Sequence, residues 1–210
     1  MAYQMHKISV LVVEDNLPML EITKSLLLTF GVGHVITAQN GEIGYKRFCE
    51  TNPDIVIADW MMRPVDGISL TEKIRTDNKS PNPYVPVILM TGFSEKRRVF
   101  QARDAGVTEF LVKPFTARDL YKRLVQVIER PRQFVKAEAF FGPDRRRRSS
   151  GPYEGPMRRD ADFSNPLSRE ALMVQQDEAQ KNLARIREQS GLKKGDKFEI
   201  NMNPDDIDMV

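Results

Sequence analysis

Five polar side chains stand where apolar segments end, and their types suit phosphoryl chemistry. Glu14 and Asp15 follow one such segment, Asp59 ends another, and Thr91 and Lys113 end two more. Three carboxylates in one cleft repel each other unless a cation joins them, and hard oxygen ligands of this kind suit Mg²⁺. A lysine and a threonine hydroxyl opposite them would hold an oxyanion. The set predicts a site for a divalent metal and a phosphoryl group, provided that the fold brings these residues together.

The elements that must position these side chains alternate regularly over the first 130 residues. Apolar runs predict strands at residues 8–13, 34–38, 54–59, 86–91 and 109–113. The spacing of apolar residues predicts helices at about 17–30, 41–50, 66–76, 95–105 and 116–129. Such alternation is typical of a parallel sheet with helices on both faces. Function in these folds gathers at the carboxyl ends of the strands, where the five polar side chains stand.

Several segments, in this order along the chain, resemble the receiver domains of two-component response regulators. They are VLVVEDN, DIVIADWMMRPVDG, VILMTG and EFLVKPF, and AQNGEIGYKRF is similar to that family's second-helix segment. The resemblance covers about residues 7–130. It implies an α/β, flavodoxin-like, doubly wound fold whose five-stranded parallel sheet has the strand order 2-1-3-4-5.

The resemblance also implies a phosphoacceptor and a metal site. Asp59 is expected to attack the phosphohistidine of a sensor histidine kinase or a histidine phosphotransfer protein. Glu14 and Asp15 are expected to bind Mg²⁺ together with Asp59 and the backbone carbonyl of Met61.

Three further positions complete the set that the resemblance implies. Lys113 is expected to pair with the phosphoryl oxygens, and Thr91 to move toward the phosphate and donate a hydrogen bond to it. Thr91 and Phe110 are expected to form the switch, with the ring turning inward as Thr91 moves. The Lys113–Pro114 bond is expected to be cis, although ordinary X–Pro bonds are cis only about 5–6% of the time.

The sequence departs from the family pattern near the acceptor. Arg63 stands where the family usually places proline, and Pro64 follows it; we expect Arg63 to point into water. Met61 and Phe93 lie two residues after Asp59 and Thr91, at positions where polar side chains can orient an attacking water. Because both side chains are apolar, slow autodephosphorylation is expected.

The composition changes beyond the predicted receiver domain. We predict an N-terminal arm at 1–6, the receiver domain at 7–130 and a Pro/Gly/Arg-rich linker at 131–165. A single amphipathic helix is predicted at 166–190 and a mobile tail at 191–210, so that the extension is largely disordered apart from one helix. Two copies of an aromatic-x-Gly-Pro-x-Arg-Arg motif, FFGPDRR and YEGPMRR, suggest either a docking motif for an acidic protein surface or a spacer.

Bulk properties restrict the function classes. The 210 residues carry a formal net charge of +3 and a single cysteine, Cys49, so no intrachain disulfide forms. No run reaches the roughly 18 apolar residues that a membrane span needs. We therefore expect a cytoplasmic protein. A nucleic-acid partner is not expected, because residues 131–210 offer one credible helix, too few for a helix-turn-helix.

The leading hypothesis is a two-component response regulator that signals through protein contacts and has no enzymatic output, catalysing only its own phosphorylation and slow dephosphorylation. A haloacid dehalogenase-type phosphatase would need an aspartate where Met61 stands. In a flavodoxin, Glu14 and Asp15 would repel the flavin phosphate. A DNA-linked transcriptional regulator that uses the basic extension, and a phosphorylation-independent receiver-like scaffold, remain alternatives.

Overall fold

The computed structural model describes residues 5–92, 102–130, 132, 134–137 and 140–143. The chain enters through a short 3₁₀ helix, η1 (Met5–Lys7), and then alternates strands and helices. The strands of the main sheet are β1 (Ser9–Val13), β2 (His34–Ala38), β3 (Ile55–Asp59), β4 (Val87–Thr91) and β5 (Glu109–Val112). The helices are α1 (Leu17–Thr29), α2 (Gly41–Thr51), α3 (Gly67–Thr76) and α5 (Ala117–Glu129).

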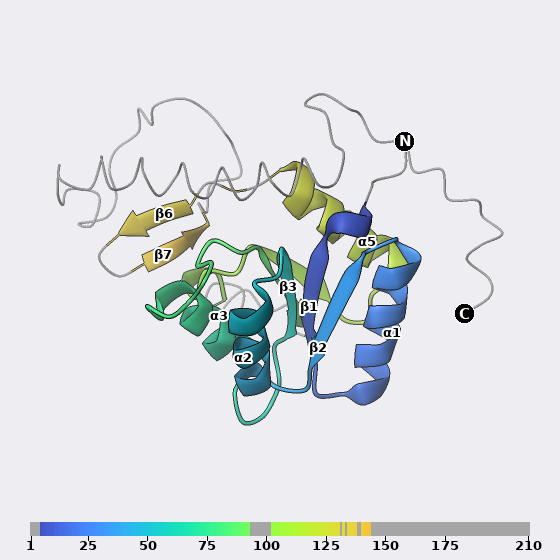
Figure 1. Cartoon of the computed structure of the whole chain (residues 1–210), viewed down its shortest axis with the longest axis horizontal. Coiled ribbons are helices and arrows are strands. Elements are labelled where there is room, and N and C mark those ends of the chain that lie inside the picture. The colour runs from blue at the N-terminus through green and yellow to red at the C-terminus, as the bar shows by residue number, and fades with distance from the viewer. Residues whose placement is uncertain (1–4, 93–101, 131, 133, 138–139, 144–210) are drawn as a thin grey trace.

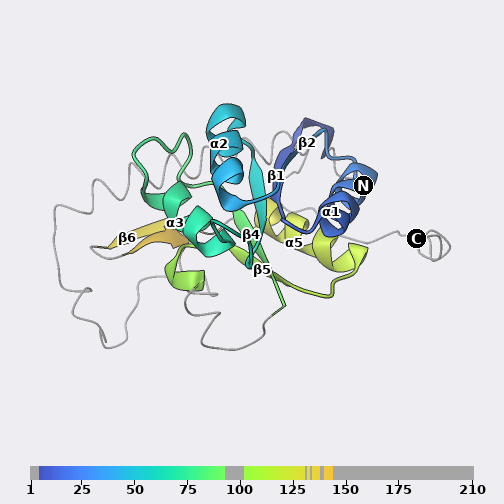
Figure 2. The ribbon, with the colours of Figure 1, turned by 90° about the horizontal axis from the view of Figure 1, so that it is seen from below.

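The five strands form one parallel sheet in the order β2-β1-β3-β4-β5, which confirms the predicted flavodoxin-like fold. Helices α1 and α5 cover one face of the sheet, and α2 and α3 cover the other (Figures 1 and 2). The central strands β1, β3 and β4 are buried on both faces, as their unbroken apolar sequences require.

Alternation along each strand builds two apolar cores. Val10 and Val12 of β1 pack with α1 and α5 in one core, whereas Leu11 and Val13 pack with α2 and α3 in the other. Successive side chains of a strand point to opposite faces, so one short strand contributes side chains to both cores. The sheet is therefore fixed in register, and the positions at which its strands end are fixed with it.

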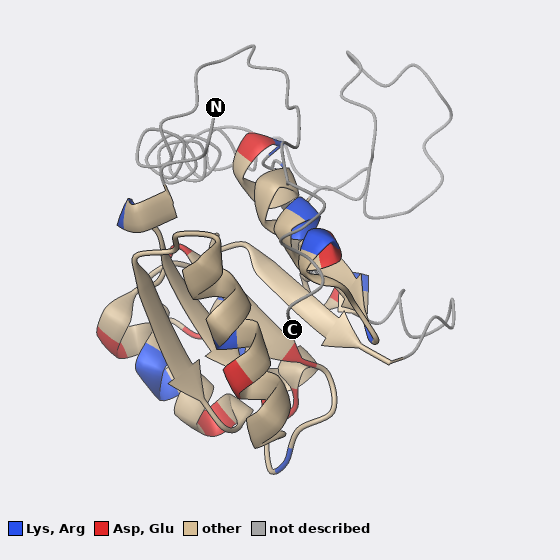
Figure 3. Ribbon diagram, turned by 90° about the vertical axis from the view of Figure 1, so that its right-hand side faces the viewer, with Lys and Arg blue, Asp and Glu red and all other residues tan. Residues whose placement is uncertain are grey.

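The helices begin at the residues that the sequence favours as caps. The side chains of Asn16, Asn40, Asp66 and Thr116 each accept a hydrogen bond from a backbone N–H in the first turn of α1, α2, α3 and α5 respectively. Thr116 and Asp119 form a reciprocal capping box. Helix α5 carries acidic and basic residues on its exposed side (Figure 3).

Residues 134–143 differ from the prediction of an unstructured linker. Strands β6 (Phe134–Ala137) and β7 (Phe140–Pro143) pair antiparallel in a second, two-stranded sheet. The hairpin forms because Phe134 and Phe141 pack against Tyr84 of the main domain, a contact with no periodic signature. It lies beside α3 (Figure 1).

Several predictions concern residues outside the described part of the chain. They are residues 1–4 of the arm, most of the helix at 95–105, residues 144–165 of the linker, the helix at 166–190 and the tail at 191–210. Residues 102–104 are helical, and Gly106 follows them with a positive φ of 90°, in keeping with the predicted helix end.

Candidate functional site

The acidic residues singled out in the sequence meet at the carboxyl end of the sheet. Asp59 is the last residue of β3, and Glu14 and Asp15 follow β1, the neighbouring strand. Glu14, Asp15 and Asp59 each offer a carboxylate oxygen, and these oxygens lie within 4.8 Å of one another. Glu14 and Asp59 are buried, whereas Asp15 is exposed. The cluster combines oxygen ligands with one face open to solvent, which fits the partly hydrated coordination of Mg²⁺.

Lys113, the residue after β5, contacts two of these carboxylates. Its Nζ lies 2.7 Å from Glu14 Oε2 and 2.8 Å from Asp59 Oδ1. The backbone N–H of Lys113 donates a 2.7 Å hydrogen bond to the carbonyl of Thr91, which fixes the lysine against the end of β4. The ammonium therefore lies within reach of any anionic group attached to Asp59.

The site shifts the ionisation of two of its members. Burial raises the pKa of Glu14 above its usual value, while the hydrogen bond from Lys113 acts in the opposite direction. Burial disfavours the charge on Lys113, but hydrogen bonds to Asp59 and Glu14, and the charges of both carboxylates, together raise the pKa of Lys113. Lys113 is therefore a cation throughout the neutral range.

Thr91 ends the strand next to Asp59, and Phe110 lies one strand further along the sheet. Thr91 ends β4, whose residue Met90 is in register with Asp59 of the adjacent β3, and the threonine is 1% exposed. Phe110 is partly buried and packs against the core shared with α2 and α3. The two predicted switch residues thus lie on neighbouring strands that pair in register.

The turn after Asp59 is held by backbone contacts that sequence reasoning did not single out. The N–H of Trp60 donates to Met90 O at 2.9 Å, and the N–H of Gly67 donates to Trp60 O at 3.1 Å. A Cβ on Gly67 would lie 2.1 Å from the carbonyl oxygen of Asp59, so only glycine permits this close approach. The signal that could have found it is the glycine that follows the helix cap Asp66 in the sequence PVDG.

Met61 and Arg63, which differ from the family pattern, lie at the solvent-exposed edge of the site. Met61 is 60% exposed beside the buried Asp59, and Arg63 is exposed, as expected for a side chain that points into water. The Lys113–Pro114 bond is cis, which confirms that prediction, and the Arg63–Pro64 bond is cis as well. Phe93 lies outside the described residues.

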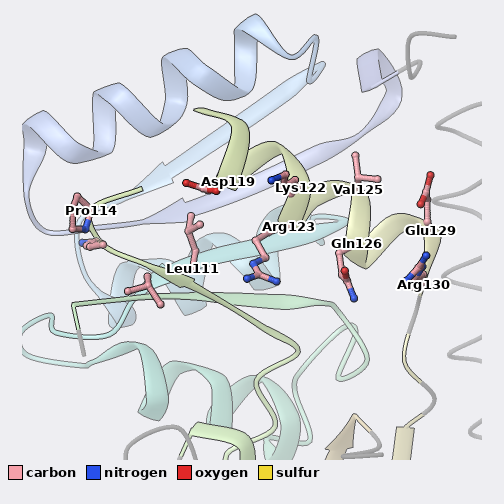
Figure 4. A pocket seen from close by; sticks show the side chains of 11 residues that line it. Leu111, Pro114, Asp119, Lys122, Arg123, Val125, Gln126, Glu129 and Arg130 are labelled. Atoms are coloured by element: carbon pink, nitrogen blue, oxygen red, sulfur yellow. The ribbon is translucent and has the colours of Figure 1, made fainter. Parts of the chain in front are cut away.

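A groove runs between β5 and α5 on the side of the domain that bears Lys113 (Figure 4). Both apolar and charged side chains line it, among them Leu111, Val112, Pro114, Lys122 and Arg123. Val112 is 49% exposed. Among the described residues, no helix has the length and apolar character to cross a bilayer.

Comparison with known proteins agrees with this geometry. The family model of the response regulator receiver domain matches residues 10–125. Chemotaxis protein CheY-3 of Vibrio cholerae is 32% identical over 121 residues, which are 58% of this chain and 92% of the relative. Chemotaxis protein CheY1 of Helicobacter pylori is 34% identical over 120 residues, which are 56% of this chain and 94% of the relative.

Solved structures show the same fold. Chemotaxis response regulator CheY4 of Vibrio cholerae superposes with a TM-score of 0.53 at 24% identity, covering 57% of this chain and 98% of that protein. The receiver domain of the sensor histidine kinase PA1611 from Pseudomonas aeruginosa gives a TM-score of 0.51 at 25% identity, covering 57% and 94%. That structure has a magnesium ion coordinated in its active-site cleft.

Proposed function

Because the chain belongs to the response regulator receiver family, we propose that it is a phosphoacceptor in a two-component system, with Asp59 as the residue that is phosphorylated. The donor is the phosphohistidine of a sensor histidine kinase or of a histidine phosphotransfer protein. The observation that carries the proposal is the position of Asp59. Its carboxylate lies beside those of Glu14 and Asp15 and 2.8 Å from Nζ of Lys113.

The transfer step is a displacement at phosphorus. A carboxylate oxygen of Asp59 forms the new P–O bond while the P–N bond of the phosphohistidine breaks and the imidazole leaves with the electron pair. The product on this chain is an acyl phosphate. Lys113 stays charged and offers N–H donors to the phosphoryl oxygens, a stabilisation that costs no reorganisation because the ammonium is already held in place.

Glu14, Asp15, Asp59 and the backbone carbonyl of Met61 would hold Mg²⁺, which neutralises the negative charge that builds up when phosphate approaches carboxylates. Burial of Glu14 and Asp59 keeps these ligands in a low-dielectric site, where such charge neutralisation is strong. The exposed Asp15 leaves one side of the cluster open to an incoming donor.

Thr91 and Phe110 would report the phosphorylated state. The Thr91 hydroxyl would donate a hydrogen bond to the phosphoryl group, and the partly buried Phe110 ring would occupy the space that this movement opens. Phosphorylation then shifts an equilibrium between two existing arrangements. The output is contact with a protein partner in the cytoplasm, through a surface that includes the groove between β5 and α5.

The test is phosphorylation of the full chain by a small phosphodonor with Mg²⁺, followed by intact mass. The wild type should gain one phosphoryl group, and Asp59→Asn should gain none. Asp104→Asn is the matched control, because Asp104 is exposed on the segment before β5 and should leave the gain unchanged. Equal phosphorylation of Asp59→Asn and wild type would refute the assignment.

A further inference from the structure

The β6–β7 hairpin lies beyond residue 125, where the match to the receiver family ends. Phe134 pairs with Pro143 and Val135 with Gly142 in an antiparallel ladder. The hairpin is reached from the end of α5, yet β7 lies against α3 (Figures 1 and 2). The chain therefore crosses the end of the sheet at which β4 and β5 begin, opposite the end that carries Asp59.

A cluster of three rings and one cation holds the hairpin there. The ring centroids of Phe134 and Phe141 lie 5.4 Å and 5.3 Å from that of Tyr84, both edge-on. The guanidinium of Arg75, at the end of α3, lies 5.0 Å from the Phe134 ring centroid. Contacts of this kind each add to the free energy gained by burying the rings.

Arg75 also ties this cluster to the start of β5. Its Nε and Nη2 donate to the carbonyl of Gly106 at 3.1 Å and 3.0 Å, and its Nη1 donates to the carbonyl of Pro83 at 2.7 Å. A Cβ on Gly106 would lie 3.1 Å from the Phe141 carbonyl oxygen. The hairpin, α3 and the segment before β5 thus meet at one buried guanidinium.

A second contact reaches β5 itself. Glu109, the first residue of β5, is 7% exposed, and its carboxylate lies 2.6 Å from Arg132 Nη2. Arg123 of α5 approaches the other carboxylate oxygen at 3.6 Å. Strand β5 spans only Glu109–Val112, and Lys113 follows it. One short strand therefore joins the ion pair at the hairpin to the ion pair at Asp59.

We propose that Arg132 and the strands β6 and β7 form a clasp that is closed while Asp59 is a free carboxylate and opens when Asp59 carries a phosphoryl group. The proposal rests on the proposed function. In the described state, Lys113 holds Glu14 and Asp59 while Arg132 holds Glu109 at the opposite end of the same strand. A phosphoryl group on Asp59 gives the ammonium of Lys113 a third anionic partner, which weakens its ion pair with Glu14 and lets the end of β5 shift. Opening of the clasp then separates β7 from α3.

The two copies of the aromatic motif differ at the position that contributes a ring to the clasp. In the first copy, Phe141 supplies a ring to the cluster on Tyr84. The second copy has Glu154 at the corresponding position, so it lacks that ring. The first copy therefore contributes Phe141 to the clasp, and the second copy cannot replace it there.

If the hairpin and the Asp59 site are thermodynamically linked, binding of a phosphoryl mimic must affect the hairpin, and a change in the hairpin must affect binding of the mimic. With the full chain, Mg²⁺ and beryllium fluoride as the phosphoryl mimic, amide exchange in 134–137 and 140–143 should accelerate by about fivefold or more on saturation. Saturation is followed by fluorescence of Trp60, the single tryptophan, next to Asp59. Reciprocally, Phe134→Ala should lower the half-saturating beryllium fluoride concentration by the same factor.

Two further variants keep the test decisive. Val135→Ala changes the neighbouring residue, whose side chain points to the opposite face of the strand, and should leave half-saturation unchanged. Arg132→Gln removes the ion pair to Glu109 without touching the rings, and should act in the same direction as Phe134→Ala. Unchanged hairpin exchange in a chain whose Trp60 shows saturation would overturn the clasp and leave the proposed function standing. If the mimic does not bind the wild type at all, the proposed function fails and the clasp fails with it.

Discussion

The ammonium of Lys113 lies 2.8 Å from the carboxylate of Asp59, although 54 positions separate the two residues in the chain (113 minus 59). The fold creates this pair by ending β3 and β5 at the same edge of the sheet, with β4 between them. The same ammonium contacts Glu14 at 2.7 Å. A single cation therefore compensates two buried carboxylates, and it is already in place for a third anionic group.

Replacing Lys113 tests this arrangement. Lys113→Met should slow phosphorylation of Asp59 by roughly 10²-fold or more, since the loss of one preorganised donor to a developing anion costs about that much. The measurement is the rate of mass gain with a small phosphodonor. Lys122→Met, which removes an exposed lysine of α5, is the control. A reduction of less than threefold for Lys113→Met would mean that the ammonium plays no part in the transfer.

Replacing Gly67 tests how the turn after Asp59 is built. Gly67→Ala should destabilise the fold by about 1–3 kcal/mol, because the added methyl group would overlap the carbonyl of Asp59. Chemical denaturation measures the change. Gly92→Ala serves as the control, since a Cβ on Gly92 meets nothing within 4 Å, and wild-type-like stability of both variants would show that the turn relaxes freely.

The capping box of α5 predicts a pH-dependent stability. Hydrogen bonds from the Thr116 side chain and backbone hold the pKa of Asp119 below its ordinary value of 3.8. A depressed folded-state pKa contributes stability above the unfolded value, and this contribution is lost as the pH falls through the folded value. Asp119→Asn should therefore be less stable than wild type at neutral pH, and the gap should close below about pH 3.8.

Thermal unfolding of both chains across the acidic range measures that gap. Because the contribution belongs to one carboxylate, Glu42→Gln, which changes an acidic residue in the first turn of α2, should not reproduce the pH dependence. A gap between wild type and Asp119→Asn that stays constant down to the lowest pH would contradict the linkage.

The exposed Met61 predicts a long-lived phosphoryl group. Its thioether is apolar and 60% exposed, so it offers no strong hydrogen bond that could orient a water against the acyl phosphate. Met61→Asn should shorten the phosphorylated lifetime several-fold, by adding both a donor and an acceptor at that position. The measurement is decay of the phosphorylated mass after removal of the donor. Met61→Leu should decay like wild type, and a wild-type lifetime of only seconds would contradict the prediction.

The main sheet and the site could be predicted because both leave local traces. Each strand is an apolar run, and Asp59 and Lys113 mark the points where two of these runs end, so the strand order alone brings them to one edge. The cap residues Asn16, Asp66 and Thr116 are equally local. The separation of the helices between the two faces follows from alternation along the strands.

The hairpin left no such trace. Phe134 and Phe141 stand in a Pro- and Arg-rich stretch, and only the distant Tyr84 and Arg75 give them a reason to be ordered. Arg75 reads as an ordinary basic residue near the end of a helix, yet it is buried, and burial lowers its pKa to about 9. At neutral pH the guanidinium is still charged, and two backbone carbonyls and an aromatic ring surround it. Such contacts join residues that are far apart in the sequence, so no periodic pattern in the sequence predicts them.

The central claim is that Asp59 receives the phosphoryl group with the help of the carboxylates and the lysine around it. The most direct measurement is the Mg²⁺ dependence of phosphorylation by a small phosphodonor, with the modified residue located by peptide mass mapping. The account predicts one phosphoryl group, on Asp59, that disappears on chelation of the metal and in Asp59→Asn. Phosphorylation at another residue, or at Asp59 with equal rates in the presence and absence of Mg²⁺, would contradict it.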